Sequence, residues 1–149
     1  WMFPGALSKV KSGLYQGNYL PSQDRQWLDR NRITAIVNAT NDYPCKFKDE
    51  GIAYCHIEVD DHPDDASILE DNLTRATEFI AEKRQNNERV LIHCAAGISR
   101  SSTITLAYLI KYENMKLDDA YSLLKSKRKM AYPNSGFWSI LQTWETKHY

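Results

Sequence analysis

Residues 89–110 constrain the fold more than any other part of the 149-residue chain. The apolar run 89–92 predicts a buried strand, and the long apolar run 103–110 predicts a central helix. The segment between them, 93–101, is short and rich in small and hydroxyl side chains. A strand that enters a helix through such a loop is typical of proteins that bind an anion, because loop amides and the helix dipole favour negative charge there. The sequence therefore predicts an anion site at residues 93–101.

One cysteine and one arginine in this segment have the chemistry needed to attack and hold a phosphate. Cys94 can act as a nucleophile in its thiolate form, an anion that a helix N-terminus, loop amides and a guanidinium all stabilise. Arg100 can bind two phosphate oxygens through its planar guanidinium, which an ammonium group cannot do. Gly97 permits a tight turn, and Ser99 and Ser101 are expected to place hydroxyls near the sulfur. The alternative is a buried, inert cysteine, which this combination of residues disfavours.

The run His93-Cys94-Ala95-Ala96-Gly97-Ile98-Ser99-Arg100-Ser101 resembles the H-C-x5-R-S signature of the cysteine-dependent protein phosphatases. Its Ala-Ala-Gly-Ile-Ser-Arg-Ser-Ser form is similar to that of the dual specificity phosphatases. The Gly-x-Gly-Arg-Thr-Gly loop of classical tyrosine phosphatases is absent. Lysines typical of phosphoinositide phosphatases are absent too, since those positions are Ala95, Ala96 and Ile98.

The resemblance extends over nearly the whole chain, which we interpret as a single catalytic domain of residues 1–149. Residues 13–18 look like the family's first strand, and residues 33–38 look like the next one. Residues 132–138 resemble the Pro-Asn-x-Gly-Phe segment that opens the family's last helix. Asn134 is expected to cap this helix, or also to brace the catalytic loops.

The resemblance also implies roles for the residues of the loop. Ser101 is expected to donate to the sulfur and to help Cys94 leave. His93 is expected to orient the loop; a role as metal ligand is disfavoured because no second Cys/His cluster has zinc spacing. No metal or cofactor is predicted, because Arg100 and the amides supply the positive charge. The expected substrate-binding residues are His93, Ala95, Ala96, Gly97, Ile98, Ser99 and Arg100.

A cysteine phosphatase also needs a general acid to protonate the leaving oxygen. The acidic run 60–65 follows an alternating strand, and in the family the acid lies on this loop in a Val-x-Asp-x-Pro-like setting. That setting selects Asp61. The alternatives are Asp60, which continues the strand's alternation, and the more distant Asp64 and Asp65.

Apolar periodicity predicts the remaining elements. Residues 53–60 alternate as a half-buried strand, and Ser67–Glu70 reads as a capping box that opens a helix. We also expect a short helix that begins after Pro21 and ends at residues 25–30, and helices at 117–127 and from residue 137 onward. Strands that alternate with helices indicate an α/β fold, phosphotyrosine-phosphatase-like, with a mostly parallel sheet flanked by helices and the site at the C-terminal end of strand 90–93.

The composition of the chain limits the kinds of partner and the cellular location that we expect. The chain has 19 basic and 19 acidic residues and a pI near 7.1, which argues against a nucleic-acid-binding surface. No apolar run approaches the ~20 residues needed to cross a bilayer, and we see no signal-peptide pattern. The odd count of three cysteines favours reduced thiols, hence a cytoplasmic or also nuclear location. The sequence makes no prediction of oligomeric state.

These observations predict a signalling protein phosphatase that hydrolyses phosphotyrosine and phosphoserine/threonine through a phosphocysteine intermediate. One alternative is a phosphatase for a non-protein phosphate, such as a lipid, an RNA end or a glycan; the neutral loop and zero net charge count against it. The other alternative is a non-catalytic phospho-binding module. Two further features have open roles. Cys55 is expected to be inert, or to resolve oxidised Cys94, and the basic run 125–129 is expected to be a solvated helix end, or to attract acidic substrates.

Overall fold

The central sheet of the computed structural model, which describes residues 5–149, has five strands in the order β1-β2-β5-β3-β4. Strands β2, β5, β3 and β4 are mutually parallel, and β1 pairs antiparallel with β2. Their bounds are β1 Leu7–Lys11, β2 Leu14–Gly17, β3 Ile33–Asn38, β4 Ala53–His56 and β5 Arg89–His93. Because β5 is central, the residue that follows it emerges in the middle of the sheet edge.

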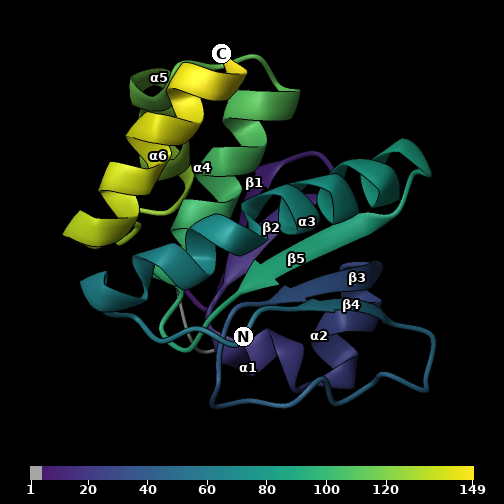
Figure 1. The fold of residues 1–149 in the computed structure, drawn as a ribbon. Coiled ribbons are helices and arrows are strands. Elements are labelled where there is room, and N and C mark those ends of the chain that lie inside the picture. The colour runs from purple at the N-terminus through teal and green to yellow at the C-terminus, as the bar shows by residue number, and fades with distance from the viewer. Residues whose placement is uncertain (1–4) are drawn as a thin grey trace.

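Helices cover both faces of this sheet (Figure 1). Helices α3, α4, α5 and α6 lie on one face, whereas the short helices α1 and α2 lie on the other. The helical bounds are α1 Tyr19–Ser22, α2 Arg25–Arg30, a 3-10 turn Pro63–Asp65, α3 Ala66–Gln85, α4 Arg100–Tyr112, α5 Leu117–Lys127 and α6 Ser135–His148. None of the helices within residues 5–149 combines the length and the apolar character that a membrane span requires.

Side chains on the two faces of β5 belong to two separate hydrophobic cores. Val90 and Ile92 belong to the larger core under α3 to α6, and Leu91 belongs to the smaller core under α2. Each of these three side chains is 0% exposed. This pattern explains why residues 89–92 read as a continuous apolar run, because a parallel strand covered on both faces has no solvent-facing side. The predicted α/β class, the parallel sheet and the position of the helices are confirmed.

Strand β1 was not predicted. Residues 13–18 were predicted to hold the first strand, but β1 precedes them and turns back at Gly13. Strand β1 lies at the sheet edge, and four of its five residues are at least partly exposed. An edge strand of this kind has no strong apolar pattern, so its residues carry little signal for a strand.

Three element boundaries also differ from the prediction. Helix α3 begins at Ala66 after the 3-10 turn, so Ser67 lies inside the helix and the predicted capping box is wrong. Residues 19–30 form two helices rather than one, because the Asp24 side chain accepts from the Gln26 amide and starts α2. Strand β4 ends at His56, although Ile57 and Val59 remain buried as the alternation predicted.

Candidate active site

The loop between β5 and α4, residues 94–99, places the cysteine at the carboxyl edge of the central strand. Cys94 follows β5 directly and is 2% exposed. Its Sγ lies 3.2 Å from the Oγ of Ser101, in the first turn of α4. A hydroxyl at this distance can donate to a thiolate. The geometry agrees with the contact predicted for Ser101.

The carbonyl oxygens of four successive loop residues, 95–98, all accept hydrogen bonds from outside the loop. The bonds are Tyr19 N to Ala95 O, 3.2 Å; Arg128 Nη2 to Ala96 O, 3.5 Å; Arg128 Nε to Gly97 O, 2.7 Å; Gln16 Nε2 to Gly97 O, 3.4 Å; Tyr132 N to Ile98 O, 2.8 Å; and Ser102 Oγ to Ile98 O, 2.6 Å. A peptide N–H points opposite to its C=O, so the loop amides face the other way. Within residues 5–149, the amides of residues 95–99 have no hydrogen-bond partner, which leaves them available to an anion.

Gly97 is the residue that allows this loop to close. Its φ is +71°, and an added Cβ would lie 2.3 Å from Arg128 Nη2 and 2.7 Å from the Gly17 backbone. Both the backbone conformation and the space therefore require glycine.

Arg100 begins α4 and is 6% exposed. Its Nη1 donates to the Val59 carbonyl at 3.0 Å, which fixes one end of the guanidinium against the segment between β4 and the acidic loop. Its buried Nε has no partner among the described residues. A buried donor left without a partner is costly, and a phosphate oxygen would satisfy it.

Sequence reasoning missed the role of Arg128. The basic run 125–129 was interpreted as a solvated helix end or an attractor of acidic substrates, yet Arg128 is 2% exposed. Besides the two loop carbonyls, its guanidinium donates to Ser8 Oγ at 3.0 Å. Burial lowers the pKa of Arg128, and the nearby Cys94 charge opposes that effect. The only sequence signal was an arginine just after the end of a predicted helix, which is also where solvated basic residues are common.

His93 ends β5 and is fully buried. Its Nδ1 lies 3.3 Å from the Cys94 carbonyl oxygen, whereas Nε2 has no partner within residues 5–149. Burial lowers the pKa of His93 to about 4, and the charges of His56 and Arg100 act in the same direction. A neutral, buried ring bonded to the loop backbone suits a residue that orients the loop. The described residues contain no group of three or more metal-ligating side chains.

Asp61 lies on the exposed loop between β4 and the 3-10 turn. Its Oδ1 accepts from the Asn134 side-chain amide at 3.0 Å. The neighbouring carboxylate of Asp60 is bonded elsewhere, since it accepts from the Asn41 side-chain amide at 2.8 Å. The contact to Asn134 links Asp61 to the segment that also contacts residues 93–101, called the phosphate loop below after the anion site that the sequence predicts there. The Asp60 carboxylate has no such link among the described residues.

Asn134 joins three parts of the site. Its side-chain Oδ1 accepts from the Phe137 amide and caps α6, and its backbone amide donates to Ser99 Oγ at 2.9 Å. The two roles left open for Asn134, helix cap and brace between loops, are thus both present. The Ser99 hydroxyl is engaged here rather than at the sulfur, so Ser101 alone has the predicted contact with Cys94 among the described residues.

Cys55 lies too far from Cys94 for a direct disulfide. It pairs with Val37 of β3, whose neighbour on the other side is Ile92 of β5, so two strand spacings of ~4.8 Å separate Cys55 from β5. Cysteines with Cα atoms more than ~7 Å apart cannot be bridged without backbone movement. Burial raises the pKa of the Cys55 thiol, and Arg75 Nη1 contacts its sulfur at 3.3 Å. The geometry therefore favours an inert Cys55 thiol over one that resolves oxidised Cys94.

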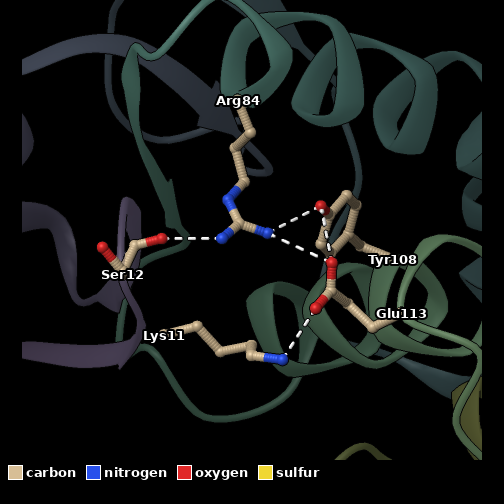
Figure 2. Close-up of polar contacts among 5 residues, drawn as sticks. All are labelled: Lys11, Ser12, Arg84, Tyr108 and Glu113. Atoms are coloured by element: carbon tan, nitrogen blue, oxygen red, sulfur yellow. Dashed lines mark hydrogen bonds and ion pairs between the residues drawn. The ribbon is translucent and has the colours of Figure 1, made fainter.

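A polar cavity of about 560 Å³ lies at the other end of the sheet, near the start of β5. Figure 2 shows that Arg84 binds the Ser12 carbonyl, the Tyr108 hydroxyl and Glu113, which in turn pairs with Lys11 at 2.7 Å. Burial would raise the pKa of Glu113, but Lys11 and Arg84 hold it below its ordinary value. These charged groups satisfy one another and fasten β1, α3 and α4 together.

Several known proteins are similar to this chain in sequence and in fold. The family model described as the catalytic domain of dual specificity phosphatases matches residues 14–147. Dual specificity protein phosphatase 21 of Homo sapiens is 39% identical over 142 residues, covering 95% of this chain and 73% of the relative. Dual specificity protein phosphatase 18 of Rattus norvegicus is 37% identical over 139 residues, covering 93% and 67%. The crystal structure of human DUSP28 superposes with a TM-score of 0.90 at 28% identity, covering 97% of this chain and 96% of that one.

The family model spans the phosphate loop, the acidic loop and the segment around Asn134, and the predicted phosphotyrosine-phosphatase-like fold is confirmed. The chain therefore belongs to the dual specificity phosphatase family and is a protein phosphatase.

Proposed function

We propose that residues 93–101 bind the phosphate of a phosphoprotein and that Cys94 attacks it, with Asp61 as general acid. The observation that carries this proposal is the set of four outward carbonyls, which leaves the amides of residues 95–99 to one anion beside the Cys94 sulfur. The partly unsatisfied Arg100 guanidinium supplies further donors to the same anion.

In the first step, the Cys94 thiolate attacks phosphorus in line with the leaving oxygen. The phosphorus–oxygen bond breaks, and the Asp61 carboxyl gives its proton to the departing phenoxide or alkoxide. Arg100 and the loop amides hold the equatorial oxygens while charge moves through the transition state. Asn134 positions Asp61 through the 3.0 Å hydrogen bond.

In the second step, water hydrolyses the phosphocysteine. The Asp61 carboxylate takes a proton from the water, whose oxygen forms the new bond to phosphorus, and the sulfur leaves as a thiolate. Ser101 stabilises that thiolate from 3.2 Å. The positive charge needed in both steps comes from Arg100 and the amides.

The two alternatives from the sequence have less support. A non-catalytic module would need only the anion-binding loop, yet Cys94, Arg100 and a tethered Asp61 occur together here. One structural neighbour, 26% identical, is described as a human tyrosine phosphatase-like serine/threonine/tyrosine-interacting protein, so turnover must be measured. A strongly anionic non-protein substrate would suit cationic side chains inside the loop, where this chain has Ala95, Ala96 and Ile98.

A role in signalling, in the cytoplasm with access to the nucleus, is also part of the proposal. It is supported by three free cysteines, one of which must stay reduced to act as the nucleophile.

The test is hydrolysis of p-nitrophenyl phosphate, phosphotyrosine peptides and phosphoserine/threonine peptides, with inositol lipid phosphates and RNA 5′ ends as competing substrates. Cys94→Ser should lower turnover by more than ~10³-fold, because a serine hydroxyl stays protonated. Circular dichroism of the variant should match that of the parent. Turnover by Cys94→Ser near the parent rate would overturn the covalent route, and preference for a lipid or RNA phosphate would overturn the substrate class.

A further inference from the structure

An aromatic groove of about 480 Å³ lies beside the phosphate loop and has no part in the steps above. It is lined by Tyr121, Tyr132, Pro133, Ser135, Trp138 and Ser139. Tyr121 comes from α5, and the others come from the start of α6 and the segment before it.

The wall of the aromatic groove is fastened to the phosphate loop. The Tyr132 amide donates to the Ile98 carbonyl at 2.8 Å, and the amide of Asn134, two residues on, donates to Ser99 Oγ. The Ile98 side chain is itself 36% exposed. These contacts place the groove next to the phosphate loop, within reach of a polypeptide whose phosphate lies in the loop.

The groove offers aromatic faces to a ligand. The Tyr132 side chain is 66% exposed, the most of any large hydrophobic residue described. Tyr121 and Trp138 meet edge to face with centroids 5.2 Å apart, and Pro133 is buried between the loop and α6. Exposed aromatic surface next to a reacting group is suited to an apolar or aromatic side chain.

One rim of the groove is positively charged. Lys125 Nζ lies 5.5 Å from the ring centroid of Tyr121 and 5.7 Å from that of Tyr132. Lys127 and Lys129 are exposed on the same stretch, and residues 125–129 include no acidic side chain. The positive charge of this rim attracts a carboxylate. The basic run 125–129 would then contribute to binding acidic substrates, one of the two roles left open for it.

We propose that the aromatic groove selects phosphoprotein substrates with an apolar or aromatic side chain near the phosphorylated residue and an acidic residue next to that side chain. The apolar side chain packs on Tyr132 and Trp138, and the carboxylate pairs with Lys125. The inference rests on the proposed function, since it assigns the groove to the substrate that the phosphate loop holds.

A substrate segment fits the groove better than other occupants do. Three extended residues span about 10 Å, at ~3.3–3.6 Å per residue, so a chain anchored by its phosphate can extend over a groove that adjoins the phosphate loop. Anchoring by the phosphate also removes most of the entropy loss on binding the second side chain.

The experiment compares phosphotyrosine peptides of one sequence in which Ala, Leu or Phe occupies each position within about three residues of the phosphotyrosine. Each kcat/KM is divided by that for p-nitrophenyl phosphate, which has no flanking residues. At the preferred position Leu or Phe should exceed Ala by about tenfold, corresponding to burial of part of one apolar side chain. Adding Glu beside that position should raise the ratio by a further two- to threefold, as expected for one partly exposed ion pair.

Two variants test the residues assigned to the groove. Tyr132→Ala should reduce the apolar preference to less than about threefold, because the exposed face is removed. Tyr149→Ala is its matched control, since Tyr149 is 56% exposed at the end of α6 and should keep the preference. Lys125→Glu should reverse the acidic preference, so that a Lys-containing peptide becomes the better substrate. Lys111→Glu is the control, because Lys111 also lies over two aromatic rings but near Trp144.

The outcomes separate the two proposals. Turnover of p-nitrophenyl phosphate without any flanking preference would overturn the groove assignment and leave the proposed function standing. A preference that survives both groove variants would overturn it as well. A preference that follows self-association of the protein would assign the groove to a second copy instead. No turnover of any phosphate would overturn the proposed function and the inference together.

Discussion

The phosphate loop and the acidic loop lie close together and are held in very different ways. Residues 93–101 are mostly buried, and four successive carbonyls are bonded to groups from β2, α1, α4 and the segment after α5. Residues 60–64 are exposed, and the Asp61 carboxylate has one described contact, to Asn134. We therefore expect the proposed nucleophile and anion donors to be held in place before substrate arrives, whereas Asp61, the proposed acid, is held by one described contact.

This difference follows from what each group must do. The amides and Arg100 must match charge that develops in the transition state, which works best when they need no rearrangement. The acid must exchange protons with water between the two steps, so an exposed position suits it. We expect substitutions in the phosphate loop to affect every substrate, and substitutions in the acidic loop to discriminate between leaving groups.

The largest effect is expected from Arg100→Lys. An ammonium cannot keep the bond to Val59 and also offer two donors to phosphate, so kcat/KM should fall by ~10³-fold for all substrates alike. Steady-state kinetics on two aryl phosphates with very different leaving groups checks this. Nearly full activity in the variant would remove Arg100 from its assigned role.

The next largest effect is expected from Asp61→Asn, which should lower kcat by an amount that depends on the leaving group. On phosphotyrosine peptides kcat should fall by roughly 10²–10³, within the range for general acids. A substrate whose leaving group is already a stable anion should lose far less.

Asp60→Asn is the matched control, because Asp60 is bonded to Asn41 and should lack the leaving-group dependence. If Asp60→Asn shows that dependence and Asp61→Asn does not, the acid is Asp60. If neither does, the acid is Asp64, Asp65 or a group outside this loop.

His93 should make the fold sensitive to acid. Burial lowers the pKa of His93 to about 4, below the ~6.5 of an unfolded chain, so the unfolded state binds an extra proton between these values. The stability of the parent should therefore fall as pH drops from ~6.5 to ~4, by up to roughly 3 kcal/mol from this residue. Urea unfolding of parent and His93→Asn across this range checks it. Parallel stability profiles for the two proteins would contradict the prediction.

The smallest effect is expected from Asn134→Ser, which cuts the tether while keeping the helix cap. Serine still caps α6, but it lacks the amide that donates to Asp61. On poor leaving groups kcat should fall about three- to tenfold, the effect of one hydrogen bond. Good leaving groups should be unaffected, and the urea midpoint should barely move. An equal loss on both kinds of substrate would show that Asn134 supports the phosphate loop instead.

The same contrast explains how much the sequence predicted. The phosphate loop is a local motif: Cys94, Gly97 and Arg100 owe their positions to one strand, one turn and one helix start. The periodic helices and β5 were likewise predicted correctly, because each buries a continuous apolar face.

Features that depend on contacts between distant segments were not predictable from local pattern. Arg128 reaches the loop across 31 residues, and nothing in its neighbours distinguishes it from the exposed lysines. Asp61 was chosen as the acid from its local setting, but its hydrogen bond to an amide 73 residues away was not foreseen. Strand β1 is defined by its partner β2 rather than by its own side chains.

The burial of Arg128 links the thermal behaviour of the protein to its ligands. Within residues 5–149 no carboxylate forms an ion pair with this guanidinium, so its charge is balanced only by dipoles and by the anion on the far side of the loop. An oxyanion in the loop supplies the missing counter-ion and, by mass action, stabilises the folded state in proportion to the logarithm of its concentration above Kd. We expect phosphate buffer, or the phosphate released by the reaction, to raise the melting temperature of the protein in this way.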